Sequence, residues 1–290
     1  MKFGIYPNLG KKDLKMALER LTALLRDKNI DYSLPLSMKK GLMDMGFTED
    51  TYETDESMGK RDFILSVGGD GSFLGAARAF RDYPVLMAGL HLGDLGFLNS
   101  MTLRDMEKRV DQILSGDYQE EHRLYLSAAL IHEDGRREKL PTVLNDVVIG
   151  HASIGQLARI RLFINDSFIQ EYAADGLIIS SPTGSTGYSL SCGGPVLGPS
   201  DDRIIIVPIC AHTLQRFAMV LSRDDVVKIT VPERELCLSL DGACTFRFNK
   251  TDTLLVRSIE KPIRFLRFRD QDFFGSITRK LVRKVADCGK

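Results

Sequence analysis

The sequence predicts an α/β domain with a parallel, helix-covered sheet, followed by a β-rich domain. Three observations carry this prediction. Apolar strands alternate with helical segments over roughly the first hundred residues, whereas strand-like segments crowd together from His122 to Val231. The chain has 290 residues, of which 43% are hydrophobic and 27% charged, so it is long enough to form two domains with sizeable cores.

The first segments show the alternation of strand and helix. Residues 2–6, "KFGIY", predict a short buried strand. Between Lys11 and Lys28, leucines and alanines recur at helical spacing, which predicts an amphipathic helix, and residues 30–36, "IDYSLPL", predict a second strand. Residues 37–60 are polar and acidic, and we expect a mobile loop there.

The same rhythm continues to about residue 114. The apolar run 63–67, "FILSV", predicts a buried strand, and residues 73–80, "FLGAARAF", predict a helix. Another strand is expected at 84–90, "PVLMAGL", and a last helix at about 103–114. Because strands separated by helices pair in parallel, these segments indicate one sheet with helices on its faces.

The second part is predicted to be mostly antiparallel, because turn signals at Glu133 and Asn165 separate neighbouring strands. The predicted strands are "LYLSAALIH" (124–132), "LPTVLNDVVIG" (140–150), "LARIRLFI" (157–164), "SFIQEY" (167–172), "GLIIS" (176–180), "RIIIVPI" (203–209) and "VVKITV" (226–231). Residues 273–285, "FFGSITRKLVRKV", predict a final amphipathic helix.

The composition excludes several classes of protein. Lys and Arg (39) balance Asp and Glu (39), so no global field attracts nucleic acid or a membrane surface. No apolar stretch is long enough to span a bilayer, and the N-terminus lacks the apolar run of a secretory signal. The five cysteines form no C-x-x-C pair and the histidines no H-E-x-x-H motif, which favours free thiols in a reducing cytoplasm over disulfides or a metal site.

A G-G-D-G turn, Gly68 to Gly71, lies where a strand passes into a helix that begins near Ser72. Glycines let phosphate oxygens approach the main chain, and the helix N-terminus favours an anion. The motif is neither a P-loop nor a G-x-G-x-x-G fingerprint. Asp70 has two interpretations, which the turn alone leaves open: it takes a proton from an attacking hydroxyl or helps to hold a cation, or it merely caps the helix.

A second candidate is the loop from Ala174 to Ser200, which is rich in glycine, serine and threonine. Such a loop offers many hydrogen-bonding groups suited to ribose and phosphate, although the same residue types also dominate ordinary turns. Neither Ser185 nor Ser191 lies in a G-x-S-x-G elbow, which argues against a serine hydrolase. Shorter polar clusters, such as "SLDGA" (239–243), follow other predicted strands.

Five stretches between Phe63 and Asp241 together resemble the motifs of the NAD kinase family. They are "GGDGSFLGAAR", "GLHLGDLGFL", "LNDVVIG", "DGLIISSPTGSTGYSLSCGGPVL" and "PICAHTL". The resemblance implies transfer of the ATP γ-phosphoryl group to the 2′-hydroxyl of the adenosine ribose of NAD, giving NADP. It also implies an α/β domain with the G-G-D-G motif (1–101), a β-rich NAD-binding domain (102–265) and a C-terminal segment that returns to the first domain (266–290).

The resemblance also implies roles for individual residues. Asp70 is similar to the general base of the family, and the turn facing the donor phosphates comprises Gly68, Gly69, Gly71 and Ser72. The expected contacts to NAD are Gly71, Phe97, Asn145, Asp146, Asp175, Thr186, Gly187, Tyr188 and Ser191. The family further implies Mg²⁺ or another divalent cation accompanying ATP, with no direct protein ligand assigned, and a homodimer or homotetramer.

The sequence departs from the family pattern at several positions. Asp146 is one methylene shorter than the usual Glu, and Gly187 replaces the common Ala. Ala173 and Ala174 precede Asp175 where an Arg-containing pair is common, so one charge contact to NAD is missing there. Two alternatives stay open: another G-G-D-G kinase acting on a lipid, and a non-catalytic NAD(P) sensor, which would more naturally lose Asp70.

Overall fold

The computed structural model describes residues 1–93, 96–151, 157–212 and 217–278, which divide into two compact units. Unit 1 comprises Met1–Glu121 and the chain from Ile263 onward, and unit 2 comprises His122–Pro262. The sequence placed the divisions after residues 101 and 265. The first division lies later because the helix at Met106–Ser115 buries its apolar face in the core of unit 1.

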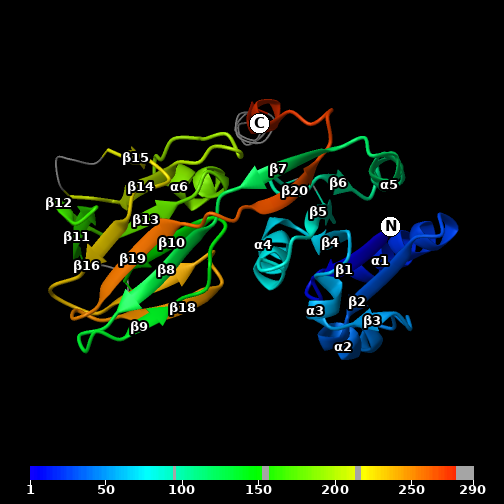
Figure 1. Ribbon diagram of the computed structural model, residues 1–290, viewed down its shortest axis with the longest axis horizontal. Helices are drawn as coiled ribbons and strands as arrows, with labels where there is room; N and C mark the ends of the chain where they lie inside the picture. Colours follow the sequence, from blue (N-terminus) through cyan, green and yellow to red (C-terminus); the bar gives the residue numbers. More distant parts are fainter. Residues whose placement is uncertain (94–95, 152–156, 213–216, 279–290) are drawn as a thin grey trace, which may run out of the picture. The chain divides into compact units, whose positions relative to one another are not determined.

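Unit 1 contains the predicted parallel sheet, with strands in the order β3-β2-β1-β4-β5-β20-β7 and β6 beside β5 (Figure 1). The strands are β1 (Lys2–Pro7), β2 (Asp31–Pro35), β3 (Tyr52–Glu53), β4 (Phe63–Gly68), β5 (Leu86–His91), β6 (Met101–Thr102), β7 (Gln119–Arg123) and β20 (Ile263–Arg267). The pairs among β1, β2, β4, β5 and β20 are parallel. The α/β prediction is therefore confirmed.

The helices of unit 1 are α1 (Leu14–Asp27), α2 (Lys39–Asp44), α3 (Asp55–Met58), α4 (Asp70–Ala79), α5 (Met106–Ser115) and α7 (Phe273–Ile277), with a 3₁₀ turn η1 (Leu36–Met38). Three helices that the sequence predicts, α1, α4 and α5, bury apolar side chains in the unit. Leu14, Leu18, Leu21 and Leu25 of α1 are fully buried in the core of the unit, as their spacing requires. α5 ends at Gly116, whose φ of 74° is the left-handed conformation that glycine adopts readily.

The prediction of a mobile loop over residues 37–60 is wrong, because η1, α2, β3 and α3 lie there. Leu42 and Met58 are fully buried in this segment. Glu53 accepts hydrogen bonds from Arg61 Nε (3.0 Å) and Nη2 (2.6 Å). This ion pair neutralises part of the acidic charge of the segment, and the local sequence does not reveal it.

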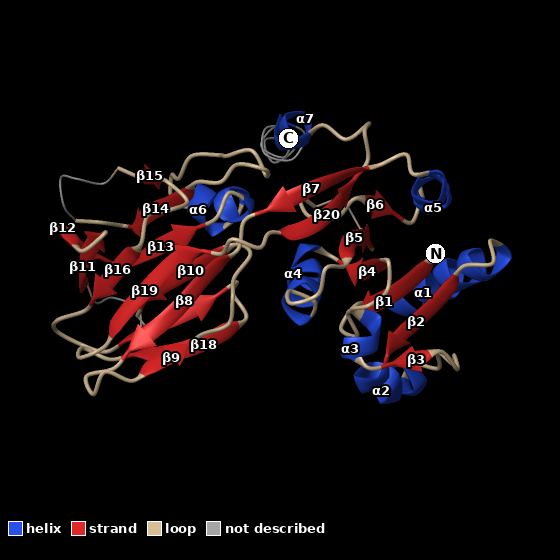
Figure 2. Cartoon of the chain, viewed as in Figure 1, coloured by secondary structure: helices blue, strands red, loops and turns tan. Residues whose placement is uncertain are grey.

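Unit 2 consists almost entirely of strands (Figure 2), in the two orders β15-β14-β13-β10-β17-β18 and β12-β11-β16-β19-β8-β9. The elements are β8 (Leu126–Ile131), β9 (Arg137–Lys139), β10 (Asp146–Gly150), β11 (Ala158–Ile164), β12 (Ser167–Ala174), β13 (Gly176–Ser180), η2 (Thr183–Thr186), α6 (Tyr188–Ser191), β14 (Ile204–Ile209), β15 (Met219–Leu221), β16 (Val227–Thr230), β17 (Leu236–Leu240), β18 (Cys244–Phe248) and β19 (Thr253–Ser258). The pairs in both sheets are antiparallel, which confirms the β-rich prediction.

One hydrophobic core takes side chains from both sheets of unit 2. Val147 of β10 and Leu177 of β13 contribute from one sheet, and Leu130 of β8 and Ile160 of β11 from the other. Each of these strands turns alternate residues toward this core, as a sheet requires. β13 is also covered on its opposite face, where Ile178 packs in a separate cluster, so all five of its residues are buried.

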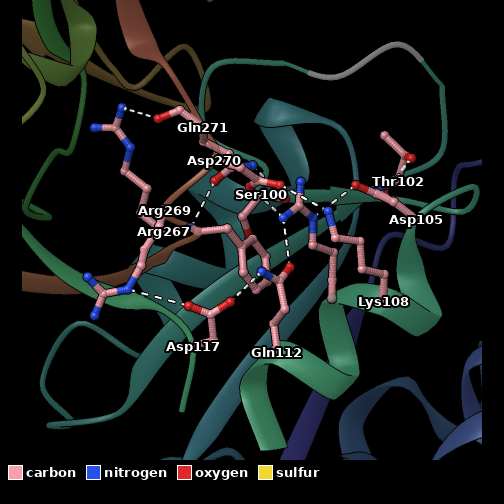
Figure 3. A network of polar contacts seen from close by, with 12 residues as sticks. Ser100, Thr102, Asp105, Lys108, Gln112, Asp117, Arg267, Arg269, Asp270 and Gln271 are labelled. Atoms are coloured by element: carbon pink, nitrogen blue, oxygen red, sulfur yellow. Dashed lines mark hydrogen bonds and ion pairs between the residues drawn. The ribbon is translucent and has the colours of Figure 1, made fainter. Parts of the chain in front are cut away.

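The C-terminal segment returns to unit 1, as predicted, and Figure 3 shows the polar contacts that hold it. Asp270 accepts a hydrogen bond from Arg109 Nη1 of α5 at 2.6 Å, and the Arg109 guanidinium lies 4.4 Å from the centre of the Phe268 ring. Gln271 donates to the Ser100 carbonyl at 2.6 Å. The predicted final helix is present as α7 up to Ile277, and the rest of it, from residue 279, lies outside the described residues.

Candidate active site

The G-G-D-G turn joins β4 to α4 in unit 1. Gly69 is the N-cap of α4 and Asp70 its first residue, so the helix begins two residues earlier than the sequence indicates. A Cβ on Gly68 would collide with Ser72 Oγ, whereas a Cβ on Gly71 would meet nothing within 4 Å. Gly68 is therefore required by packing, and the Gly71 position leaves open space beside the amides at the helix N-terminus.

Ser72 holds the turn together. Its Oγ accepts hydrogen bonds from the Gly69 N–H at 3.1 Å and from Asn8 Nδ2 at 2.8 Å. The Asn8 N–H in turn donates to the Val67 carbonyl at 3.0 Å, so the loop after β1 is fastened to the end of β4. Ser72 thus acts within the turn, and its hydroxyl proton is left to donate to another group.

Two side chains from outside the motif lie close to Gly69. A Cβ placed on Gly69 would lie 3.4 Å from His91 Nε2 and 4.0 Å from Lys11 Nζ. His91 Nδ1 accepts from the Gly93 N–H at 2.9 Å, so the proton of the neutral ring is assigned to Nε2. The sequence analysis assigned neither residue a role, because Lys11 lies in the loop after β1 and His91 at the end of β5, which only the parallel sheet brings to one edge.

The Asp70 carboxylate is held by the loop that follows β5. Oδ2 accepts from the Phe97 N–H at 2.7 Å, and Oδ1 accepts from the Leu98 N–H at 3.2 Å and from Asn99 Nδ2 at 2.7 Å. A Cβ on Gly96 would collide with this carboxylate, so a glycine is needed for the loop to approach. The helix-capping interpretation of Asp70 is wrong, because its side chain bonds the distant loop and not the first turn of α4.

In unit 2, the Asn145–Asp146 pair lies at the start of β10 and is held by Asp241. The Asp241 carboxylate accepts from the N–H groups of Leu144 (3.0 Å), Asn145 (2.7 Å) and Asp146 (3.3 Å). Asp241 itself has a φ of 50°, a left-handed conformation uncommon for a residue with a side chain. The cluster "SLDGA" was a weak signal in the sequence, and the structure gives its acid a definite role.

Asp146 is a buried carboxyl group with 6% of its surface exposed. Burial, and next the negative charge of Asp241, raise its pKa from 3.8 to about 7. The group therefore exists in both protonation states near neutral pH. In the neutral form it donates a hydrogen bond, and in the ionised form it only accepts.

Ser181 connects the glycine- and serine-rich loop of unit 2 to the Asn145–Asp146 pair. Its N–H donates to the Asn145 carbonyl at 2.8 Å, and its hydroxyl donates to the Leu144 carbonyl. Gly184 allows the loop to lie directly on the Asn145 carbonyl, which a Cβ would strike. Asn145 Oδ1 is buried and has no hydrogen-bond partner among the described residues, so an acceptor is available there.

Asn145, Asp146 and Asp241 help to line a pocket of about 330 Å³, within the size range of small-molecule sites. Its walls are Asn145, Asp146, Val148, Tyr188, Ser239, Asp241 and Gly242. Tyr188 has 46% of its surface exposed, and burial together with the charges of Cys192, Cys210 and Asp175 raises its pKa. The structure thus brings Asn145, Asp146 and Tyr188 of the predicted NAD contacts together.

Comparison with known proteins identifies the chain. Residues 3–118 match the model of the ATP-NAD kinase N-terminal domain, and residues 144–268 match that of the ATP-NAD kinase C-terminal domain. The NAD kinase of Thermoanaerobacter sp. (strain X514) is 32% identical over 286 residues, which cover 98% of this chain and 99% of that relative. The chain belongs to the NAD kinase family. The NAD kinase of Tolumonas auensis is 38% identical over 224 residues, 76% of each chain.

Solved structures of NAD kinase family members share the fold. The yeast NADH kinase in complex with NADH superposes with a TM-score of 0.87 at 21% identity, covering 97% of this chain and 87% of that one. The Archaeoglobus fulgidus NAD kinase in complex with ATP gives a TM-score of 0.75 at 20% identity, covering 97% and 98%. These matches confirm an α/β domain followed by a β-rich domain.

The other expected contacts of this NAD kinase family member are not among the residues that line this pocket. Thr186 ends η2, Gly187 precedes α6, and Ser191 ends α6. Asp175 lies exposed between β12 and β13. Gly71 and Phe97 belong to unit 1, where the Phe97 ring lies 6.3 Å from that of Phe273. In the motif "PICAHTL", Thr213 and Leu214 lie outside the described residues.

Proposed function

We propose that this NAD kinase family member transfers the γ-phosphoryl group of ATP to the 2′-hydroxyl of the adenosine ribose of NAD. The observation that supports this most directly is the Asp70 carboxylate, held by three N–H donors beside the open Gly71 position of an anion-binding turn. A sensor protein needs no carboxylate there. The match over nearly the whole length to NAD kinases likewise favours this reaction over lipid phosphorylation.

In the proposed reaction, Asp70 acts as the general base. It accepts the proton of the 2′-hydroxyl, the hydroxyl oxygen uses the freed electron pair to bond the γ-phosphorus, and the bond to the bridging oxygen breaks with ADP as the leaving group. Proton removal by a positioned carboxylate contributes about 10²- to 10⁴-fold to such reactions. Positioning and electrostatic stabilisation supply most of the remainder.

The donor phosphates are proposed to lie against the turn at Gly68–Ser72. Helical geometry leaves the N–H groups of Asp70 and Gly71 without partners inside α4, so they are free to bind phosphate oxygens. Lys11 Nζ and His91 Nε2, which both lie within 4.0 Å of where a Cβ on Gly69 would stand, add two side-chain donors. Lys11 would thereby supply the positive charge that a P-loop takes from the lysine in its own motif.

The NAD contacts are proposed to centre on the pocket of unit 2. Asp146 offers a carboxyl group for a ribose hydroxyl, and the unpartnered Oδ1 of Asn145 accepts from an N–H or O–H of the ligand. The half-exposed Tyr188 ring offers a surface for stacking. Polar groups are available from Asp175, Thr186, Gly187 and Ser191, and the family resemblance adds Gly71 and Phe97.

A magnesium ion held by the protein alone does not fit the described residues. They contain no cluster of three or more His, Cys, Asp or Glu side chains that could hold a metal ion. The oxygens of Asp70 and Asp241 are already engaged by N–H donors. We therefore propose that Mg²⁺ enters as part of the substrate Mg–ATP, bound mainly through its phosphates.

We further propose that the protein works in the cytoplasm as a homodimer or homotetramer. The four cysteines within the described residues are free thiols, which supports a reducing compartment. Within the same residues, no helix is long and apolar enough to span a bilayer. Light scattering coupled to gel filtration measures the oligomeric state, and a mass equal to one chain of 32.4 kDa would contradict the proposal.

The reaction is tested by incubating the full chain with Mg–ATP and NAD and measuring NADP with an NADP-specific dehydrogenase. We expect NADP from the wild type and a loss in kcat of about 10³-fold for Asp70→Asn. The new NH₂ group would face the Phe97 N–H, so a modest loss of stability is expected too. Asp82→Asn, at an exposed carboxylate of the same unit, is the control. Phosphorylation of a lipid without NADP formation, or near-normal turnover of Asp70→Asn, would contradict the proposal.

A further inference from the structure

Asn99 is the side-chain member of the three donors on Asp70. It has 5% of its surface exposed, and its Nδ2 lies 2.7 Å from Asp70 Oδ1. Its own Oδ1 is buried, has no hydrogen-bond partner among the described residues, and packs so closely on Gly89 that a Cβ there would collide with it. A flipped amide would place two acceptors against each other, so the carboxylate determines which way the amide points.

The three donors occupy the two carboxylate oxygens unequally. Oδ1 accepts two hydrogen bonds, from Leu98 and Asn99, whereas Oδ2 accepts one, from Phe97. A carboxylate has about four acceptor positions, two on each oxygen. Counted over the described residues, one position therefore remains, and it belongs to Oδ2. The arrangement distinguishes the two oxygens chemically.

Ser100, the residue that follows Asn99 in its loop, is held through both its N–H group and its carbonyl group. The Ser100 N–H donates to the Gly89 carbonyl at 3.0 Å, and the Ser100 carbonyl accepts from Gln271 Nε2 at 2.6 Å, a pair labelled in Figure 3. Gln271 is itself fixed, because its Oε1 accepts from the Phe268 N–H at 3.1 Å. The backbone that carries Asn99 is thus fastened to β5 and to the returning C-terminal segment.

We infer that Asn99 is a positioning residue for phosphoryl transfer: it occupies Oδ1 of Asp70, so that Oδ2 is the atom that takes the proton of the acceptor hydroxyl. This inference rests on the proposed function, in which Asp70 is the base. The proton moves from the hydroxyl to Oδ2 while the hydroxyl oxygen bonds the γ-phosphorus and ADP leaves.

The test compares two variants of Asn99 with a neighbour in the same loop. Asn99→Leu removes the donor at nearly constant volume, and Asn99→Asp, which is isosteric, places a second carboxylate at hydrogen-bond distance from Asp70. Ser100→Ala is the matched control, because Ser100 is equally buried and its hydroxyl lies 3.4 Å from the Gly89 N–H, away from Asp70. The readouts are kcat, KM for NAD and the pH profile of kcat, with urea denaturation as the check of folding.

For Asn99→Leu we expect kcat to fall about 10- to 100-fold with KM for NAD changed less than about threefold, since a hydrogen bond to a charged group is lost. The acid limb of the pH profile should move upward, because the Asp70 carboxylate loses one of its three hydrogen-bond donors. For Asn99→Asp the limb should move further, because two adjacent carboxylates share one proton. Ser100→Ala should leave the limb in place.

A structural role alone would lower kcat in all three variants without moving the acid limb, and that result would overturn the inference. Asn99→Asp keeps the measurement available if Asn99→Leu does not fold. Failure of the proposed function has a different signature, because wild-type protein would then form no NADP at any pH. If the wild type forms NADP and Asn99→Asp keeps an unshifted profile, only the role of Asn99 is refuted.

Discussion

Replacing Asp146 with Asn should make the protein more stable at alkaline pH and change its stability much less at acidic pH. The substitution keeps the shape of the side chain and removes a carboxyl group that burial and Asp241 keep from ionising readily. An acid whose folded-state pKa is raised binds its proton more tightly in the folded protein. Its contribution to stability is therefore full below the unfolded-state pKa and is lost as the pH rises through the folded-state pKa.

The magnitude follows from the pKa of Asp146, which is raised from 3.8 to about 7. Such a rise corresponds to about 4 kcal/mol of stability lost between acidic and alkaline solution, at about 1.36 kcal/mol for each pH unit. Between pH 5 and pH 8.5, the same linkage relation gives a loss of about 2.5 kcal/mol from the wild-type free energy of unfolding. Asn carries no titrating group, so Asp146→Asn should gain about this much relative to the wild type over that interval.

The assay is urea denaturation followed by circular dichroism at both pH values, for wild type and variant. Comparing the two proteins at each pH cancels the titration of all other groups. Asp175→Asn, which removes an exposed carboxylate of the same unit, serves as the control. An Asp146→Asn effect that is equal at pH 5 and pH 8.5 would refute the reasoning.

Three further predictions concern other parts of the chain. Lys11→Met should raise KM for ATP about tenfold in steady-state assays and leave KM for NAD unchanged, because only the donor phosphates lose a charge; an equal rise in both would contradict this. Arg109→Met should lower the free energy of unfolding in urea by roughly 2 kcal/mol, because the hydrogen bonds from the buried Arg109 to Asp105, Gln112 and Asp270 are lost; a change below about 0.5 kcal/mol would argue against it. Hydrogen bonding to Asp252 raises the pKa of His132, so its stabilisation is full in acid and is lost as the pH rises through the folded-state pKa. His132→Gln should therefore lower the urea midpoint at pH 6 more than at pH 8.5, and a uniform loss would exclude this linkage.

The sequence by itself was sufficient for the type of many elements up to Val231, whereas strands β18, β19 and β20 were not predicted. Helical spacing in α1 and the apolar runs of β4, β5 and β13 are local properties of the chain, and each predicted the correct element. The segment 37–60 was mispredicted because its acidic residues gain partners such as Arg61 only after folding. Its buried residues, such as Met58, are separated by polar ones and show no periodicity.

The local sequence also identified the Gly68–Gly71 turn and the Ala174–Ser200 loop as candidate binding segments, since glycines and small polar residues at strand ends can bind phosphate and ribose. It left Asp70 undecided between a cap and a base, because both roles require the same residue type at the same position. The tertiary structure decided against the cap by placing three N–H donors from a loop 27 to 29 residues away on the carboxylate. The contacts of Lys11, His91, Asn99 and Asp241 became visible only there, because these contacts join atoms that are close in space, whatever their separation along the chain.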